Sequence, residues 1–173
     1  DADGRILTCG SFAKSHGLTA ARVGWLAGYR HLVQPCAAAA LLSAPPAPAL
    51  CQNAALQIVR RVCVILNETH SDFTARRQYV RNRLLEMGLE PWAASAGFFL
   101  WVSVPNGEAG NVFAQRLLSA TGVLVNPGHV FGPSGEAFVR VSFATAEGRL
   151  REALIRLARF VAGCEFDSPL VAT

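Results

Sequence analysis

The sequence contains almost no lysine. It has 16 lysine and arginine residues among 173, and Lys14 is the only lysine. An arginine guanidinium stays protonated, so it cannot provide the neutral amine that condenses with a carbonyl group. The chain carries its positive charge on arginines and keeps one lysine amine. This pattern favours an interpretation in which Lys14 performs Schiff-base chemistry.

Long apolar segments are absent as well. No stretch approaches the ~20 consecutive apolar residues that a membrane helix needs, because prolines interrupt residues 32–50. We therefore expect no membrane partner. Charged residues make up only 16% of the chain and hydrophobic residues 51%, with a mean hydropathy of +0.29. This composition predicts apolar surface that packs against further protein.

Metal-binding and disulfide patterns are missing too. The five cysteines form no Cys-x-x-Cys pair and are odd in number, which predicts reduced thiols and a cytoplasmic protein. The four histidines lack metal-ligand spacing, so we expect no metal site. The net charge is +4, but the arginines follow helical stretches without interleaved aromatic residues. We expect no nucleic-acid partner.

The residues around Lys14 suit a bound phosphate. Residues 5–9 are a short apolar run typical of a strand, and Gly10 and Ser11 break it, which places Lys14 just past a strand end. Open α/β sheets bind ligands at such ends. Ser11 offers a hydroxyl and Arg22 a doubly donating cation, a suitable pair for a dianionic phosphate. The spacing alone also fits a strand, loop and strand with an exposed lysine and arginine.

The same stretch resembles a known cofactor-attachment motif. Residues 11–14 (Ser-Phe-Ala-Lys), 17–18 (Gly-Leu) and 22–24 (Arg-Val-Gly) are similar to the pyridoxal-phosphate motif of class I and II aminotransferases, the fold-type I group. Ala20 is a mild departure, because glycine or asparagine is common there. The resemblance implies that Lys14 attaches the cofactor, while Ser11 and Arg22 hold its phosphate.

Periodicity and turn residues predict the other elements. Helical spacing predicts helices over residues 32–42, 49–66, 71–87, 111–121 and 147–162. The prolines of 45–48 and Gly88 mark breaks, and Asn111 is expected to cap its helix. Short apolar runs predict strands over 22–28, 89–93, 98–104, 123–125 and 138–143. We expect an α/β fold with a turn at 126–128 and a loose tail over 165–173.

Arg140 is the second candidate site residue. Alternation along residues 138–143 places Val139 and Val141 on one face and Arg140 on the other. An arginine on a rigid strand can clamp a carboxylate in a bidentate fork, although an ordinary edge-strand arginine has the same pattern. Residues 122–128, 131–132 and 138–140 resemble the aminotransferase small-domain pattern. That resemblance implies that Arg140 binds the substrate α-carboxylate.

The resemblance extends over nearly the whole chain. It implies that residues 1–45 are the end of the large cofactor-binding domain, and that 46–173 form interdomain helices and the small C-terminal α/β domain. Residues 43–46 and 95–101 resemble the lead into the interdomain helix and the strand at the active-site mouth. Residues 1–5 and 97–101 lean towards the 2-aminoadipate and aromatic aminotransferase branch.

The expected function is that of a transaminase moving an amino group between an amino acid and a 2-oxo acid, as a homodimer. The chain opens without an initiator methionine, so we expect a fragment or a processed product. In the family, the aspartate that pairs with the pyridine nitrogen and other cofactor contacts precede the lysine motif. We therefore expect this chain alone to be inactive. The alternatives are a non-catalytic effector domain of a MocR-type transcription regulator and an inactive truncated product.

Overall fold

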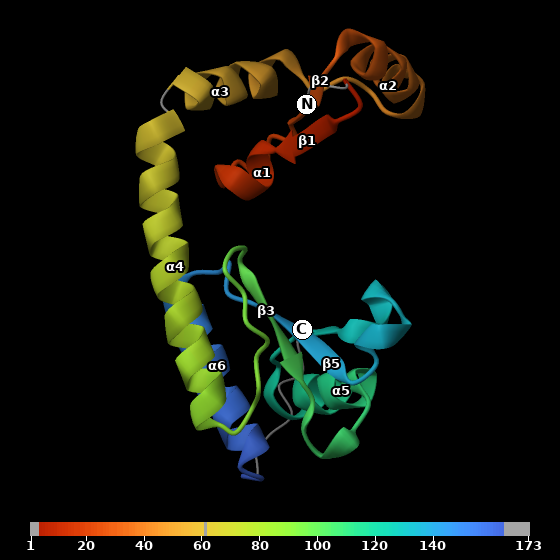
Figure 1. The fold of residues 1–173 in the computed structure, drawn as a ribbon. Helices are drawn as coiled ribbons and strands as arrows, with labels where there is room; N and C mark the ends of the chain where they lie inside the picture. Colours follow the sequence, from red (N-terminus) through yellow and green to blue (C-terminus); the bar gives the residue numbers. More distant parts are fainter. Residues whose placement is uncertain (1–3, 61, 165–173) are drawn as a thin grey trace. The chain divides into compact units, whose positions relative to one another are not determined.

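The computed structural model describes residues 4–60 and 62–164 (Figure 1). The chain separates into two compact units, Asp1–Asp72 and Phe73–Thr173, which we call unit 1 and unit 2. The assignment of 1–45 and 46–173 to two aminotransferase domains stays a prediction. The tail expected to be loose, residues 165–173, lies outside the described residues, as do the first three residues of the 1–5 segment.

Unit 1 contains a two-stranded antiparallel sheet. Strand β1 (Leu7–Ser11) pairs with β2 (Gly24–Gly28), so that Ser11 lies opposite Gly24 and Gly10 opposite Trp25. The short helix α1 (Phe12–Ser15) follows β1 directly, and α2 (Arg30–Ser43) and α3 (Ala49–Arg60) follow β2. The prolines of 45–48 separate α2 from α3, as expected, because proline cannot continue a helix.

Unit 1 buries little of its apolar surface. Its cluster of buried side chains consists of Phe12, Ala21, Val23 and Ala55, and none of the residues of α2 is buried. Large apolar side chains that stay exposed occur on all of its longer elements: Ile6, Leu7, Trp25, Leu26, Tyr29, Leu41, Leu42, Leu50, Leu56 and Val59. Exposed apolar surface of this extent is typical of a segment that packs against other protein.

The boundary between the helices expected over 49–66 and 71–87 lies elsewhere in the structure. We expected helices over 49–66 and 71–87, but α4 runs from Val62 to Glu86 and is helical throughout residues 67–70. Those four residues are Asn, Glu, Thr and His, none of which breaks a helix as glycine or proline does. Gly88 follows the end of α4 with φ 75°, the left-handed conformation of a helix C-terminus, as expected.

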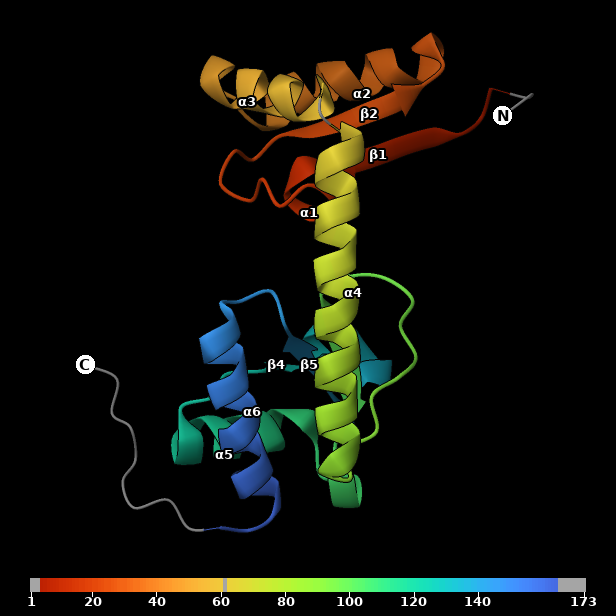
Figure 2. The ribbon, with the colours of Figure 1, turned by 90° about the vertical axis from the view of Figure 1, so that its left-hand side faces the viewer.

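Unit 2 is a three-stranded antiparallel sheet with helices on one face. The strand order is β3 (Phe99–Ser103), β5 (Phe138–Ser142) and β4 (Asn126–Pro127). Helix α5 (Gly110–Thr121) lies between β3 and β4 in the sequence, and α6 (Glu147–Val161) closes the unit. Figure 2 shows the lower part of α4 running beside α6 in front of the sheet. Short 3-10 turns cover Pro105–Gly107, Gly128–Phe131 and Pro133–Gly135.

The helices of unit 2 bury the inner face of its sheet. This face presents Leu100 and Val102 of β3 and Val139 and Val141 of β5 to side chains of α4, α5 and α6. The remaining members of the core are Val80, Leu84, Leu89, Val104, Phe113, Ala114, Leu117, Val125, Phe143, Leu150, Leu154 and Leu157. The expected alternation of residues 138–143 is confirmed, because Val139, Val141 and Phe143 are all buried.

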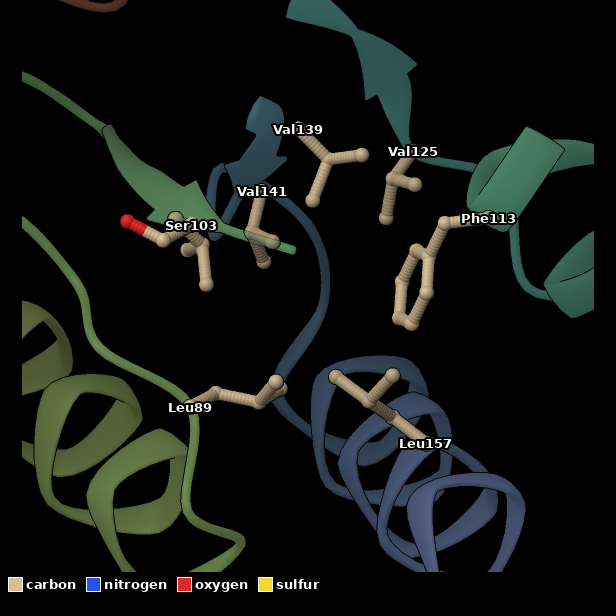
Figure 3. Close-up of a pocket in the computed structure, with 8 residues that line it drawn as sticks. Leu89, Ser103, Phe113, Val125, Val139, Val141 and Leu157 are labelled. Carbon is tan, nitrogen blue, oxygen red and sulfur yellow. The ribbon is translucent and has the colours of Figure 1, made fainter. Parts of the chain in front are cut away.

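A cavity of about 10 Å³ remains inside this core (Figure 3). Valine, leucine and phenylalanine side chains surround it, and the Ser103 hydroxyl points away from the centre (Figure 3). A buried water needs two to four polar partners, which this lining does not supply. The cavity is a packing gap and not a ligand site.

Four expected details of unit 2 are wrong. Residues 89–93 form no strand, and Pro91 makes only an isolated bridge to Val102, flanked by hydrogen bonds from Trp92 N to Trp101 O (2.8 Å) and from Ser103 N to Glu90 O (3.2 Å). Residues 123–125 form no strand, and the turn expected at 126–128 is strand over Asn126–Pro127, where pairing with β5 begins. Helix α5 has Ala109 and not Asn111 as its N-cap, since Gly110 N already donates to Glu136 O (2.7 Å) and fixes where the helix begins.

Candidate active site

Lys14 lies on a single helical turn directly after β1. Helix α1 has four residues, and Ser11 caps it by accepting a hydrogen bond from Ala13 N at its Oγ (3.2 Å). Phe12 and Ala13 are buried, whereas Lys14 is exposed. We expected the strand to end at Cys9 and Lys14 to lie in a loop. The strand instead continues to Ser11, so Lys14 is helical and still follows a strand end.

Phe12 holds this turn in place. Its amide donates to Val23 O (3.2 Å), and its carbonyl accepts from both His16 N and Leu18 N (3.1 Å each). Burial of the Phe12 side chain anchors the same residue in the unit 1 cluster. Residues 12–18 therefore curl around one buried side chain, which leaves the Lys14 side chain on the outer surface of the turn.

Arg22 has an unusual backbone conformation. Its φ is 54°, in the left-handed region that residues other than glycine seldom occupy. The conformation costs about 1–2 kcal/mol for an L-residue. It is held by the flanking residues Ala21 and Val23, which are both buried, while the Arg22 side chain is exposed. The strand expected from Arg22 therefore begins only at Gly24.

The three predicted groups of unit 1 fit pyridoxal phosphate chemically. The Ser11 hydroxyl accepts the Ala13 amide, which leaves its own proton free to donate to an oxygen acceptor. Arg22 adds a guanidinium, the side chain best matched to phosphate oxygens. Lys14 adds the primary amine that reacts with an aldehyde. An amine, a hydroxyl and a guanidinium within residues 11–22 match an aldehyde and a phosphate on one cofactor.

His16 has an environment that sequence reasoning missed. It lies just after α1, its Nε2 is buried, and its ring lies 5.2 Å from that of Phe12. Its Nδ1 lies 2.6 Å from Ser15 Oγ, and Ser15 Oγ also donates to Ser11 O (3.1 Å). The spacing of four residues between Phe12 and His16 was the available signal, because such pairs meet on one helical turn.

Arg140 lies on the outer face of the unit 2 sheet, as expected. In the strand register it pairs with Trp101 of β3 and with Asn126 of β4. Its Nη2 donates a hydrogen bond to Asn126 Oδ1 (2.9 Å). The guanidinium carbon lies 5.1 Å from the ring centre of Phe99 and 5.0 Å from that of Phe131, within cation–π range.

These neighbours of Arg140 are functional candidates that sequence reasoning did not name. Asn126 was expected to be only a turn residue, and the two phenylalanines were part of the resemblance without a role of their own. No local pattern could indicate these contacts. Residues 99, 126 and 131 come close to Arg140 only because three strands pair in one sheet. Among the described residues, Arg140 makes no salt bridge, so no described carboxylate neutralises its charge.

The predicted site residues divide between the two units. Ser11, Lys14 and Arg22 belong to one stretch of unit 1, while Arg140 belongs to unit 2.

No helix in the described part of the chain is both long and apolar enough to cross a membrane.

The chain belongs to the class I and II aminotransferases, because the model of that family matches residues 1–157. Enzymes of this family depend on pyridoxal phosphate, and their structures define the fold-type I class. The α/β fold and the resemblance inferred from residues 11–24 are confirmed at this level.

The matched relatives are longer proteins. The chain is 33% identical over 156 residues to the arginine–pyruvate transaminase of Pseudomonas aeruginosa, covering 89% of this chain and 40% of that protein. It is 30% identical over 158 residues to aromatic-amino-acid aminotransferase 2 of Thermococcus litoralis, covering 90% and 41%. The crystal structure of the Pyrococcus horikoshii aromatic aminotransferase matches with a TM-score of 0.82 at 29% identity, covering 92% and 44%. The chain thus spans about two fifths of the length of these relatives.

Proposed function

We propose that this chain is part of a pyridoxal-phosphate-dependent transaminase that moves an amino group between an amino acid and a 2-oxo acid. One observation carries the proposal: the only lysine of the chain occupies an exposed position of the turn after β1, inside the stretch that matches the family. The bound cofactor supplies an aldehyde and a ring that accepts electrons from the substrate Cα.

Lys14 has two tasks in this proposal. Its Nζ attaches the cofactor covalently, which a guanidinium could not do. As a free amine, the same group would act as the general base that takes a proton from the substrate Cα. The exposure of Lys14 on a turn anchored by Phe12 supports both tasks, because a cofactor and a substrate can reach an exposed amine.

Ser11 and Arg22 bind the cofactor phosphate and do not take part in proton transfer. The Ser11 hydroxyl keeps a proton for a phosphate oxygen while its oxygen caps α1. Arg22 compensates the phosphate charge with paired N–H donors. A phosphate held by Ser11, the N-cap of the turn that carries Lys14, would limit where the cofactor aldehyde can lie relative to the amine.

Arg140 binds the substrate carboxylate. It is a cation on a paired strand, without an acidic partner among the described residues. A bidentate fork from its guanidinium would orient any amino acid or 2-oxo acid by the carboxylate that all of them share. This shared group is what lets one site take both the amino donor and the oxo acceptor.

We further propose that the active enzyme is a cytoplasmic homodimer and that this chain alone does not turn over substrate. The exposed apolar side chains of unit 1 support the need for further protein surface. The four cysteines whose side chains are described, Cys9, Cys36, Cys51 and Cys164, are free thiols, which fits a reducing compartment.

The experiment that tests the function is reductive trapping. Borohydride treatment of the protein with pyridoxal phosphate should label the peptide that contains Lys14, as read by peptide mapping. Lys14→Ala should abolish both the label and transamination, and Lys14→Arg should fail equally although it keeps the charge. Labelling confined to another site would overturn the assignment, and labelling of Lys14 in a full-length protein without turnover would favour a non-catalytic effector domain.

The phosphate assignment has its own test. Arg22→Ala should weaken cofactor binding by about 1.5–3 kcal/mol, the usual scale for hydrogen bonds to a charged group. Substrate preference should change little. The matched control is Arg30→Ala, since Arg30 is an exposed arginine at the start of α2 in the same unit. An unaltered cofactor affinity in Arg22→Ala would show that Arg22 is structural.

A further inference from the structure

One short segment of unit 2 supplies two of the three groups that surround the Arg140 guanidinium. Asn126 accepts its hydrogen bond, and Phe131 lies five residues later on the adjoining turn. Phe99 of β3 supplies the third contact. The two rings attract the cation over their faces and so limit its position. They form no directed hydrogen bond, however, and a cation–π contact does not select which edge of the guanidinium faces outward.

The hydrogen bond to Asn126 is the directional contact. A guanidinium has five N–H donors in a fixed plane. The Nε of Arg140 is buried without an acceptor among the described residues, and Nη2 donates to Asn126 Oδ1. The donors that remain are those of Nη1 and the second proton of Nη2. These donors leave at least one N–H on each of Nη1 and Nη2 for the two oxygens of a carboxylate.

The acceptor is neutral, and this matters for a ligand that is an anion. An aspartate at the same place would form an ion pair with Arg140 and compete with an incoming carboxylate. The asparagine amide orders the guanidinium but leaves its full positive charge for the ligand. Its strand position is also set, because Asn126 lies opposite Arg140 in the β4–β5 register.

We propose that Asn126 is the positioning residue for Arg140, setting the in-plane orientation in which its Nη1 and Nη2 end receives the substrate carboxylate. This inference rests on the proposed transaminase function, in which Arg140 binds that carboxylate. Asn126 acts through Arg140 and does not itself contact the reacting atoms.

The test is a double-mutant cycle in the pyridoxal-phosphate-loaded protein that contains this chain. The probe is 3-phenylpropionate, which has a carboxylate and no amino group, and its Kd is measured by calorimetry. Asn126→Leu keeps the shape of the side chain and removes the acceptor. We expect it to weaken the probe by about fivefold, a typical coupling for residues in contact. The KM for the amino acid and for the 2-oxo acid should rise by similar factors while kcat stays nearly unchanged.

Two comparisons separate positioning from a structural role. Asn126→Asp keeps an acceptor but pairs its own carboxylate with Arg140, so we expect the probe to bind more weakly than to the wild-type protein. In an Arg140→Ala background, Asn126→Leu should change the probe Kd no further. The matched control is Asn111→Leu, because Asn111 is an exposed asparagine on α5 of the same unit and should leave the Kd unchanged.

The outcomes distinguish the inference from the function on which it rests. An unchanged Kd in Asn126→Leu, or an equal loss in the Arg140→Ala background, overturns the inference and leaves the transaminase proposal standing. Unchanged probe binding in Arg140→Ala itself overturns the carboxylate role of Arg140, and the inference falls with it.

Discussion

The two units of the chain differ in how completely each encloses its own apolar side chains. In unit 2, three helices cover one face of the sheet, and side chains such as Leu84, Leu100 and Phe143 have no solvent exposure at all. In unit 1, four buried residues form the cluster, and Leu42 of α2 remains 91% exposed. The difference teaches that the second unit can be stabilised by its own contacts, whereas the first needs surface that the described residues do not supply.

The largest effect should come from separating the units. A fragment of residues 62–173, which keeps α4 whole, should unfold cooperatively on heating, because its apolar core is closed. A fragment of residues 1–72 should show no cooperative transition and should associate, since its apolar surface stays in water. Calorimetry and sedimentation would measure both. A cooperative transition of a monomeric 1–72 fragment would contradict the comparison.

Truncation of single apolar side chains should reproduce the contrast at a smaller scale. Leu84→Ala removes a fully buried side chain and should lower the free energy of unfolding by about 2–5 kcal/mol, the range for buried leucines. Leu42→Ala removes a side chain that is already in solvent and should change it by less than about 0.5 kcal/mol. Urea denaturation of the whole chain would compare them. Equal losses would mean that Leu42 is covered.

Two glycines sharpen the comparison, because adding a methyl group should lower stability at one of them and raise it at the other. A Cβ at Gly10 of β1 would lie 2.5 Å from the Trp25 ring, so Gly10→Ala should destabilise the β1–β2 pair by about 1–2 kcal/mol. A Cβ at Gly148 of α6 would meet open space, so Gly148→Ala should stabilise α6 by about 0.5–1 kcal/mol through helix propensity. Hydrogen exchange of the strand and helix amides would read both. Stabilisation by Gly10→Ala would show that Trp25 moves aside freely.

The smallest effect should come from surface charge. Arg116 and Glu108 of unit 2 form an ion pair at 2.7 Å, with side chains 61% and 21% exposed. Arg116→Gln should cost less than about 1 kcal/mol, because exposed ion pairs are weak. The loss should shrink further at about 1 M salt, where the screening length is about 3 Å. A large, salt-independent loss would show that the contact of Arg116 with the Phe160 ring, at 5.4 Å, contributes more than the charge pair.

The sequence predicted most of what depends on local pattern. The β5 alternation that exposes Arg140 and the left-handed stop at Gly88 both follow from residue type and spacing. Helix α6 follows in the same way, ending within a residue of the expected position. The expectations that failed depended on partners far along the chain. Gly110, for example, begins α5 because its amide bonds to Glu136, which no local rule contains.

The residues of the candidate site also differ in whether the local sequence could identify them. Ser11, Lys14 and Arg22 fall within one stretch, so a motif could name them, although their roles in the chain stay predictions. The strained backbone of Arg22 has no sequence signal, since nothing in its residue type favours a φ of 54°. Asn126 could not be found either, because its link to Arg140 exists only in the three-stranded register.

The segment that carries Asn126 of β4 and Phe131 of the following turn also has a consequence for directed evolution. A Cβ at Gly128 would collide with the Gly135 carbonyl and reach the Trp101 ring at 3.0 Å, and a Cβ at Gly135 would collide with the Gly128 carbonyl. Random libraries that include positions 128 and 135 would consist largely of misfolded variants. Libraries restricted to positions 126 and 131, whose side chains are exposed, would sample the surroundings of Arg140 on an unchanged backbone. Selection can therefore vary positions 126 and 131, whereas it must keep glycine at 128 and 135.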